Sequence, residues 1–173
     1  ATDPVAVVAI FKEVGAPKRL SILVEGESLF NDATAIVVFT ILIAMITSPS
    51  EPGIIDGAIE FIRIFFGGIF IGFITSRIVC WIISLMDDLP LFAITLTISM
   101  AYLTFIWAEH YFHVSGVMAV VTAALVIGSR GRTVLSPESW NSVHHTWEHI
   151  GFWANSIIFI LVGITVPNLM TDF

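Results

Sequence analysis

Five long apolar stretches constrain what this chain of 173 residues can fold into. A hydrocarbon core about 30 Å thick is crossed by roughly 20 helical residues. Stretches of about that length cover residues 20–47, 58–85, 89–108, 114–129 and 150–166. A shorter stretch, Pro4–Phe11, predicts a partial helix, because proline favours the first helical position. We therefore expect an all-α polytopic membrane protein, with about five full transmembrane helices plus a leading half-helix, that is part of a larger fold.

The composition supports a membrane protein and excludes several other classes. Hydrophobic residues make up 57% of the chain and charged residues 12%, against about 45–50% and about 25% in soluble domains. This balance excludes a disordered chain, a basic nucleic-acid-binding domain and most soluble enzymes. We find no P-loop, no dinucleotide fingerprint and no nucleophile elbow. We therefore expect the lipid bilayer as a partner, and we expect no nucleic acid, no cofactor and no enzymatic activity.

Basic residues fall almost entirely on one side of the predicted membrane. If successive spans alternate in direction, all but Arg63 of the 7 Lys and Arg residues share one side. Lys and Arg mark cytoplasmic loops, so we assign that side to the cytoplasm. An amphipathic stretch, Pro137–His149, is expected to form a surface helix there, ahead of the fifth span. The residues on the cytoplasmic side are Lys12, Lys18, Arg19, Arg77, Arg130 and Arg132.

The first full span carries polar residues that lipid does not tolerate. Glu25, Glu27 and Asp32 lie in an otherwise apolar stretch, and a charge at the bilayer centre costs at least about 2.5–3.5 kcal/mol. Ser28 and Asp32 are four residues apart and share a helix face, as do Glu27 and Asn31. For Ser28, Glu25 and Asn31, hydrogen bonding between helices is an alternative interpretation.

Two depth estimates bring a second acid close to Asp32. Asp32 lies roughly 18 Å beyond Leu20 along a helix, near the middle of the membrane. The half-helix starts at about Pro4, and Asp3 is roughly 14 Å from Lys12, so this helix also begins near the midplane. A helix broken at that depth is typical of ion sites in secondary transporters.

The order and spacing of several motifs resemble the sodium/proton exchangers of the monovalent cation:proton antiporter-1 family. The resemblance covers essentially the whole chain, and its most specific parts are the Thr-Asp-Pro and Asn-Asp pairs. The matching pieces are Ala1–Pro4, Gly26–Ala33, Ser115–Val117, Gly128–Arg132 followed by Leu135–Glu138, and Asn155–Phe159.

The resemblance implies a role for each polar residue. Asp32 would bind cation or proton in competition, with Ser28, Thr2 and Asp3 completing the site. Asn31 would be the conformational partner of Asp32, steadied by Glu27. Transported Na⁺ would be held by Asp32, Ser28 and Thr2, and it is the only metal expected.

The resemblance also implies the activity and the architecture. The activity is electroneutral exchange of Na⁺, or of Li⁺ or K⁺, for H⁺ by alternating access. The location is the cell membrane, as a multi-pass protein that forms a homodimer at full length. Residues 1–47 would belong to the ion-transporting core domain, residues 48–88 to a linking helix, and residues 89–173 to the scaffold and dimerisation domain. This chain begins in the middle of a broken helix, so we expect it to hold half of a site.

Two other functions are alternatives to ion exchange. A non-transporting membrane scaffold or sensor that keeps the antiporter fold is the main alternative. A membrane metalloenzyme would need metal ligands, and the cluster of His144, His145, Glu148 and His149 could supply some of them. A solvated surface of the helix explains this cluster more simply.

Gly68 and Gly72 are four residues apart, and this spacing of small residues predicts close packing against another helix.

Overall fold

A computed structural model describes residues 7, 10, 11, 13–47, 54–85 and 89–171. The chain runs through α2 (Lys18–Thr47), α3 (Ile54–Leu85), α4 (Pro90–Ile106), a π-helical turn η1 (Trp107–Tyr111), α5 (Gly116–Val134) and α6 (Pro137–Thr171). No strand occurs in this described part of the chain. Five helical segments are long and apolar enough to cross a membrane, which confirms the all-α membrane fold.

The predicted leading helix is described only in part. Val7, Ile10, Phe11 and Glu13 are helical, and the predicted start at Pro4 lies outside the described residues. The helix ends where the sequence predicts, before Gly15, whose φ is +69°. The Ala16 N–H donates to the Phe11 carbonyl at 2.9 Å, the six-to-one bond that closes a helix on a glycine in the left-handed region.

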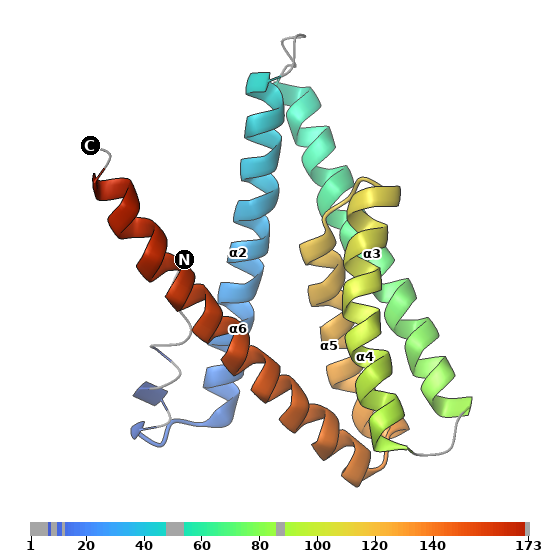
Figure 1. The fold of residues 1–173 in the computed structure, drawn as a ribbon. Helices are drawn as coiled ribbons and strands as arrows, with labels where there is room; N and C mark the ends of the chain where they lie inside the picture. The colour runs from blue at the N-terminus through green and yellow to red at the C-terminus, as the bar shows by residue number, and fades with distance from the viewer. Residues whose placement is uncertain (1–6, 8–9, 12, 48–53, 86–88, 172–173) are drawn as a thin grey trace.

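The helices alternate in direction, as expected from the loops (Figure 1). α2, α4 and α6 begin at the same end of the bundle, and α3 and α5 finish there (Figure 1). Arg19, Arg77 and Arg132 therefore lie toward one end, and Arg63 lies nearer the other. The structure confirms the alternation, and the assignment of the Arg-rich end to the cytoplasm stays a prediction.

α3 and α5 form the most extensive helix pair of the described residues. A Cβ atom at Gly68 would lie 2.5 Å from the Ser115 carbonyl oxygen, and one at Gly72 would overlap the Ala119 carbonyl. The Ser115 N–H donates to the Ile64 carbonyl at 3.1 Å, which links the two backbones directly. The predicted small-residue contact is thus confirmed, and α5 is the partner helix.

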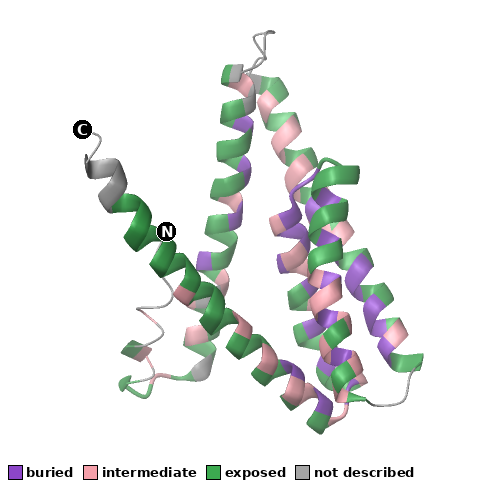
Figure 2. Ribbon diagram, in the orientation of Figure 1, coloured by how far each residue is buried: buried purple, intermediate pink, exposed green. Residues whose placement is uncertain are grey.

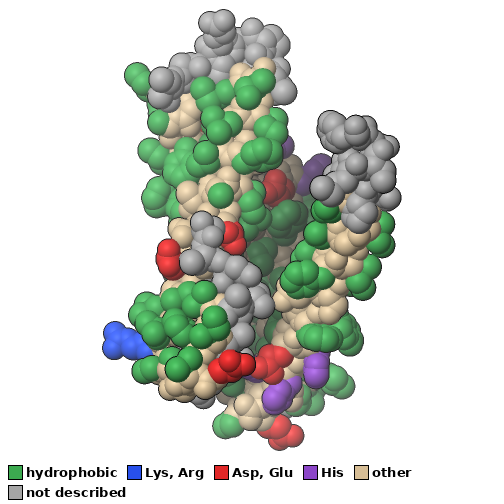
Figure 3. All heavy atoms as spheres, turned by 90° about the vertical axis from the view of Figure 1, so that its left-hand side faces the viewer, with side chains coloured by type: hydrophobic (Ala, Val, Ile, Leu, Met, Phe, Trp, Pro, Cys, Tyr) green, Lys and Arg blue, Asp and Glu red, His purple; other side chains and the backbone are tan. Residues whose placement is uncertain are grey.

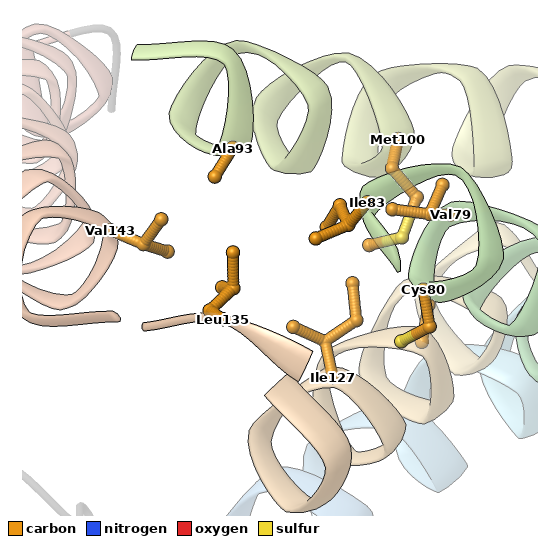
Figure 4. Close-up of a cluster of buried hydrophobic side chains, with 9 residues drawn as sticks. Val79, Cys80, Ile83, Ala93, Met100, Ile127, Leu135 and Val143 are labelled. Atoms are coloured by element: carbon orange, nitrogen blue, oxygen red, sulfur yellow. The ribbon is translucent and has the colours of Figure 1, made fainter. Parts of the chain in front are cut away.

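Apolar side chains from four helices form the core near the Arg-rich end. α3 contributes Val79, Cys80 and Ile83 (Figure 4). They meet side chains of α4, α5, α6 and the α5–α6 connection, namely Ala93, Met100, Ala123, Ile127, Leu135 and Val143. Buried residues concentrate in α3, α4 and α5, while the second half of α6 is almost wholly exposed (Figure 2).

The surface helix expected ahead of the fifth span forms the first part of α6. The predicted surface helix at residues 137–149 and the predicted fifth span are one continuous helix, α6, of 35 residues. The predicted surface stretch therefore leads into the fifth span without a break in the helix. The first turns of α6 are amphipathic, as the sequence predicts, since Ser139 and Val143 are buried against the bundle while most of the residues around them are exposed.

Candidate functional site

Asp32 lies halfway along α2, as the sequence predicts. α2 has 30 residues and begins directly after Pro17, which cannot continue a helix but is well placed ahead of one. Asp32 is roughly 21 Å from the first residue of α2 and roughly 22 Å from its last. The structure therefore places an acidic side chain near the centre of a helix long enough to cross a bilayer.

One face of α2 packs on the rest of the bundle. Ala33, Val37 and Ile41 are buried on this face and form a cluster with Met118 of α5. Side chains of α3 complete the contact, among them Ile64, Phe65 and Ile69. These apolar contacts hold α2 against α3 and α5, and they decide which way its other faces point.

The polar residues occupy the opposite face of α2. Ser28 is nine residues before Val37, and Asp32 is nine residues before Ile41. Nine residues are about two and a half helical turns, so each pair lies on opposite sides of the helix. Asp32 is exposed, whereas Ser28 is fully buried. The surface seen from this side of the molecule is largely hydrophobic, with isolated acidic side chains in it (Figure 3).

Ser28 and Asp32 together present two kinds of oxygen. They are four residues apart, which separates their directions by about 40° around the helix axis. A carboxylate and a hydroxyl are the oxygen ligands that hard cations prefer. The pair can therefore supply part of a cation site on the face of α2 that turns away from α3 and α5.

Asn31 and Glu27 are in direct contact. The Asn31 Nδ2 donates a hydrogen bond of 3.0 Å to Glu27 Oε1. Both side chains are exposed, and an amide–carboxylate pair one turn apart stabilises a helix by about 0.2–0.5 kcal/mol. The structure thus brings together the two residues that the sequence pairs, and the functional role of the contact stays a prediction.

The structure does not describe two of the predicted cation ligands. Thr2 and Asp3 lie outside the described residues, as does the side chain of Glu25. The site that the structure describes therefore consists of Asp32, Ser28, Asn31 and Glu27, all on α2.

Comparison with known proteins decides the family. The sequence profile of the family described as "Sodium/hydrogen exchanger, transmembrane" matches residues 1–172. This chain belongs to the sodium/hydrogen exchanger family. It is accordingly a multi-pass membrane protein, which agrees with its five helices of membrane-spanning length.

Individual relatives of this exchanger chain come from bacteria and plants. The chain is 39% identical to the Na⁺/H⁺ antiporter NhaG of Bacillus atrophaeus over 99% of its own length. It is 41% identical to the low-affinity Na⁺/H⁺ antiporter NhaS1 of Synechocystis sp. over 94%, and 38% identical to sodium/hydrogen exchanger 7 of Arabidopsis thaliana over 99%. The chain spans 33%, 31% and 15% of these three proteins, respectively.

Glu109 of this exchanger chain is a positioning residue that the sequence reading missed. The Gly116 N–H at the start of α5 donates to Glu109 Oε1 at 3.0 Å. Ser115 caps the same helix end, since its Oγ accepts from the Met118 N–H at 3.2 Å. Met118 in turn packs on α2. Glu109 thus helps to fix the helix against which the Asp32-bearing helix rests.

Only one part of this arrangement, the N-cap at Ser115, could be predicted from the sequence. A serine directly before a helical stretch, as at Ser115, is a recognisable N-cap. The position of Glu109 depends on the π-helical turn at Trp107–Tyr111 and on the loop after it, where His113 has a φ of 51°. Helical periodicity carries no information about either feature, so the contact could not be found from spacing.

The histidine cluster on α6 pairs with an acid instead of forming a metal site. His144 Nδ1 lies 3.5 Å from Glu148 Oε1, and His145 Nδ1 lies 3.1 Å from Glu148 Oε2. Among the residues that the structure describes, no group of three or more His, Cys, Asp or Glu side chains could hold a metal ion. The metalloenzyme reading therefore finds no support in this part of the exchanger.

Proposed function

We propose that the protein carrying this chain exchanges Na⁺, or Li⁺ or K⁺, for H⁺ across the cell membrane. The observation that carries the proposal is the exposed carboxylate of Asp32, halfway along α2 and on the face opposite its packed side. The relatives named as Na⁺/H⁺ antiporters support the same activity. Because the chain spans a third or less of those relatives, the activity belongs to a longer protein.

The proposed mechanism is competition for one carboxylate. Ionised Asp32 is costly within a membrane, where a charge costs at least about 2.5–3.5 kcal/mol. Binding either a proton or a monovalent cation neutralises it, so the occupied site crosses the membrane more readily than the empty one. One cation exchanged for one proton makes the cycle electroneutral, and alternating access carries the occupied site between the two sides.

We assign the remaining polar residues to supporting roles. Ser28, one turn before Asp32, supplies a neutral oxygen, and Thr2 and Asp3 supply further ligands. The hydrogen bond from Asn31 to Glu27 holds the Asn31 amide in one orientation beside Asp32. We propose that other helices of the full protein cover the Asp32 face of α2 and complete the site.

We also propose a division of the chain into moving and static parts. Residues 1–47 would belong to the mobile core domain, residues 48–88 to the linking helix, and residues 89–173 to the scaffold that dimerises. In support, one apolar face of α2 makes its contacts with α3 and α5, whereas α3 and α5 interlock through backbone contacts at Gly68 and Gly72. A smooth apolar contact is better suited to sliding than an interlocked one.

The experiment that tests the activity is proton flux in vesicles that contain the full-length protein. Na⁺, Li⁺ or K⁺ pulses across a pH series should drive exchange in the wild type, with cation affinity weakening as the pH falls. Asp32→Asn keeps the size of the side chain and removes its charge, so exchange should be lost. Asp56→Asn is the matched control, since Asp56 lies exposed in the first turn of α3, and it should leave exchange intact.

Exchange like that of the wild type in Asp32→Asn would contradict the assignment of Asp32 as the carrier. Absence of cation-dependent flux in the wild type would favour a membrane scaffold or sensor that keeps the fold without transporting. Normal folding of each variant is checked by its elution as a single species after purification.

A further inference from the structure

α4, α5 and α6 enclose a continuous apolar groove that the ion site does not use. Two adjacent cavities, of about 570 Å³ and about 410 Å³, lie between these helices. Both are lined by Ala101, Val120 and Trp147, so they join at these residues. We call the joined cavities the α4–α6 groove. Tyr102 and Phe105 line its far part and are exposed, so the groove opens on the outer surface of the bundle.

The walls of the groove are chemically suited to a hydrocarbon chain. Most lining residues are apolar, including Met100, Ala124, Ile127, Val143 and Ile98. The polar Trp147 side chain is already engaged, because its Nε1 donates to Thr97 Oγ1 at 3.2 Å. A polar ligand would find few partners along most of this length, whereas an acyl chain needs none.

The end of the groove nearest the α5–α6 connection is different, because it carries a fixed positive charge. Arg132 lines the groove there, with its guanidinium carbon 5.6 Å from the centroid of the Trp140 ring. Arg132 and Trp140 also line a smaller adjoining cavity of about 330 Å³. A guanidinium held beside an aromatic ring at a membrane surface is suited to pair with a phosphate.

The other charged groups at this end leave that arginine available. Glu148 also lines the groove, but its carboxylate oxygens are within 3.5 Å and 3.1 Å of His144 and His145. Arg130 lies two residues before Arg132 and adds a second positive charge at the same end of α5. Among the described residues, Arg132 has no ion pair.

The part of the groove between Arg132 and the junction of the two cavities is about as long as one leaflet of a bilayer is thick. From Arg132 to Val120 is twelve residues of α5, or roughly 18 Å. Half of a hydrocarbon core about 30 Å thick is about 15 Å. A phosphate at Arg132 would therefore place an acyl chain along the groove as far as the middle of the membrane.

We propose that the α4–α6 groove binds one anionic phospholipid from the leaflet at the Arg-rich end. Its phosphate pairs with Arg132, and one acyl chain lies along Ala101 and Val120. Basic pockets between membrane helices are known to select anionic head groups. The choice of an anionic lipid over a zwitterionic one follows from the positive charge of Arg132, which has no ion pair among the described residues.

The first test measures lipid binding to the purified full-length protein by native mass spectrometry. The probes are phosphatidylglycerol and phosphatidylcholine with identical acyl chains. Arg132→Gln should weaken phosphatidylglycerol binding at least about tenfold, equivalent to about 1.4 kcal/mol. It should weaken phosphatidylcholine binding much less, because the choline cation already offsets the charge of that lipid's phosphate. Arg130→Gln is the matched control, because Arg130 is exposed and does not line the groove, and it should have a much smaller effect.

The second test fills the groove. Ala101→Phe places a ring where the two cavities join, and it should reduce the binding of both lipids. Leu103→Phe is its control, since Leu103 is exposed on the same helix and does not line the groove. Equal binding of the two lipids by the wild type, or unchanged binding in both Arg132→Gln and Ala101→Phe, would overturn the proposal.

A third test detects the acyl chain directly, by fluorescence quenching. Phosphatidylglycerol brominated on its acyl chains should quench Trp147, detected as the difference in quenching between the wild type and Trp147→Phe. An absence of that difference would mean that another segment of the protein, or a second copy, fills the groove in place of lipid. That outcome would overturn the lipid site without affecting the proposal for Asp32.

Discussion

Ser28 and Val37 are both buried, at 0% and 2% exposure, although they lie on opposite faces of α2. Val37 is covered by the bundle of α3 and α5. Ser28 is enclosed on the side that carries Asp32, one turn before that exposed carboxylate. α2 is therefore held by apolar contacts on one side, while its other side combines a buried hydroxyl with an accessible acid. That combination fits the cation site that we propose on this face of α2.

Removal of the Ser28 hydroxyl should weaken cation binding without ending exchange. Ser28→Ala removes one neutral oxygen, which water or another ligand can replace. The alanine side chain is small enough to fit the buried position of Ser28. We expect the apparent cation affinity in vesicle flux to fall severalfold, with the maximal rate largely kept. Ser84→Ala is the matched control, because it removes an exposed hydroxyl near the end of α3, and it should leave the affinity unchanged. Complete loss of exchange in Ser28→Ala would mean that the hydroxyl is indispensable.

The contact between Asn31 and Glu27 should be measurable as a coupling. A double-mutant cycle with Asn31→Ala and Glu27→Ala should give a coupling free energy of unfolding of about 0.2–0.5 kcal/mol, because the pair is exposed. Glu27→Gln keeps an oxygen acceptor for the Asn31 amide and should retain more exchange than Glu27→Ala. Equal flux in the two Glu27 variants would show that the hydrogen bond does not matter for transport.

Added volume at the α3–α5 crossing should destabilise the protein. Gly72→Ala forces a methyl group onto the Ala119 carbonyl, and overpacking of this kind costs typically about 1–3 kcal/mol. We expect a lower melting temperature in detergent, read by intrinsic fluorescence. Gly163→Ala is the control, because no described atom lies within 4 Å of the added carbon. A melting temperature for Gly72→Ala at or above that of the wild type would show that the two helices separate easily.

Loss of the Glu109 carboxylate should loosen the start of α5. Glu109→Ala leaves the Gly116 N–H without its acceptor, and loss of a helix cap costs about 0.5–2 kcal/mol. Glu109→Gln retains an oxygen acceptor and should recover most of that stability. Amide hydrogen exchange of residues 116–119 reports the effect locally and should be faster in the alanine variant. Equal protection in both variants would mean that Ser115 alone caps the helix.

Apolar length and helical spacing are local properties, and they were sufficient for much of this fold. The helix around Asp32 and the helix end at Gly15 are two features that such local properties predict. A stretch as apolar as α2 has few alternatives to a membrane helix, and a glycine between a helix and Ala16-Pro17 marks an end. The four-residue spacing of Asn31 and Glu27 likewise predicted a contact that the structure contains. Each of these features depends only on residues close together in the chain.

Contacts between distant residues were decided by the tertiary structure. The spacing of Gly68 and Gly72 predicts that some helix comes close, but only packing determines that it is α5. The Glu109–Gly116 bond requires a π-helical turn that periodicity does not record. A sequence specifies which side chains can share a face, whereas the surface that covers this face is supplied by residues far away in the chain.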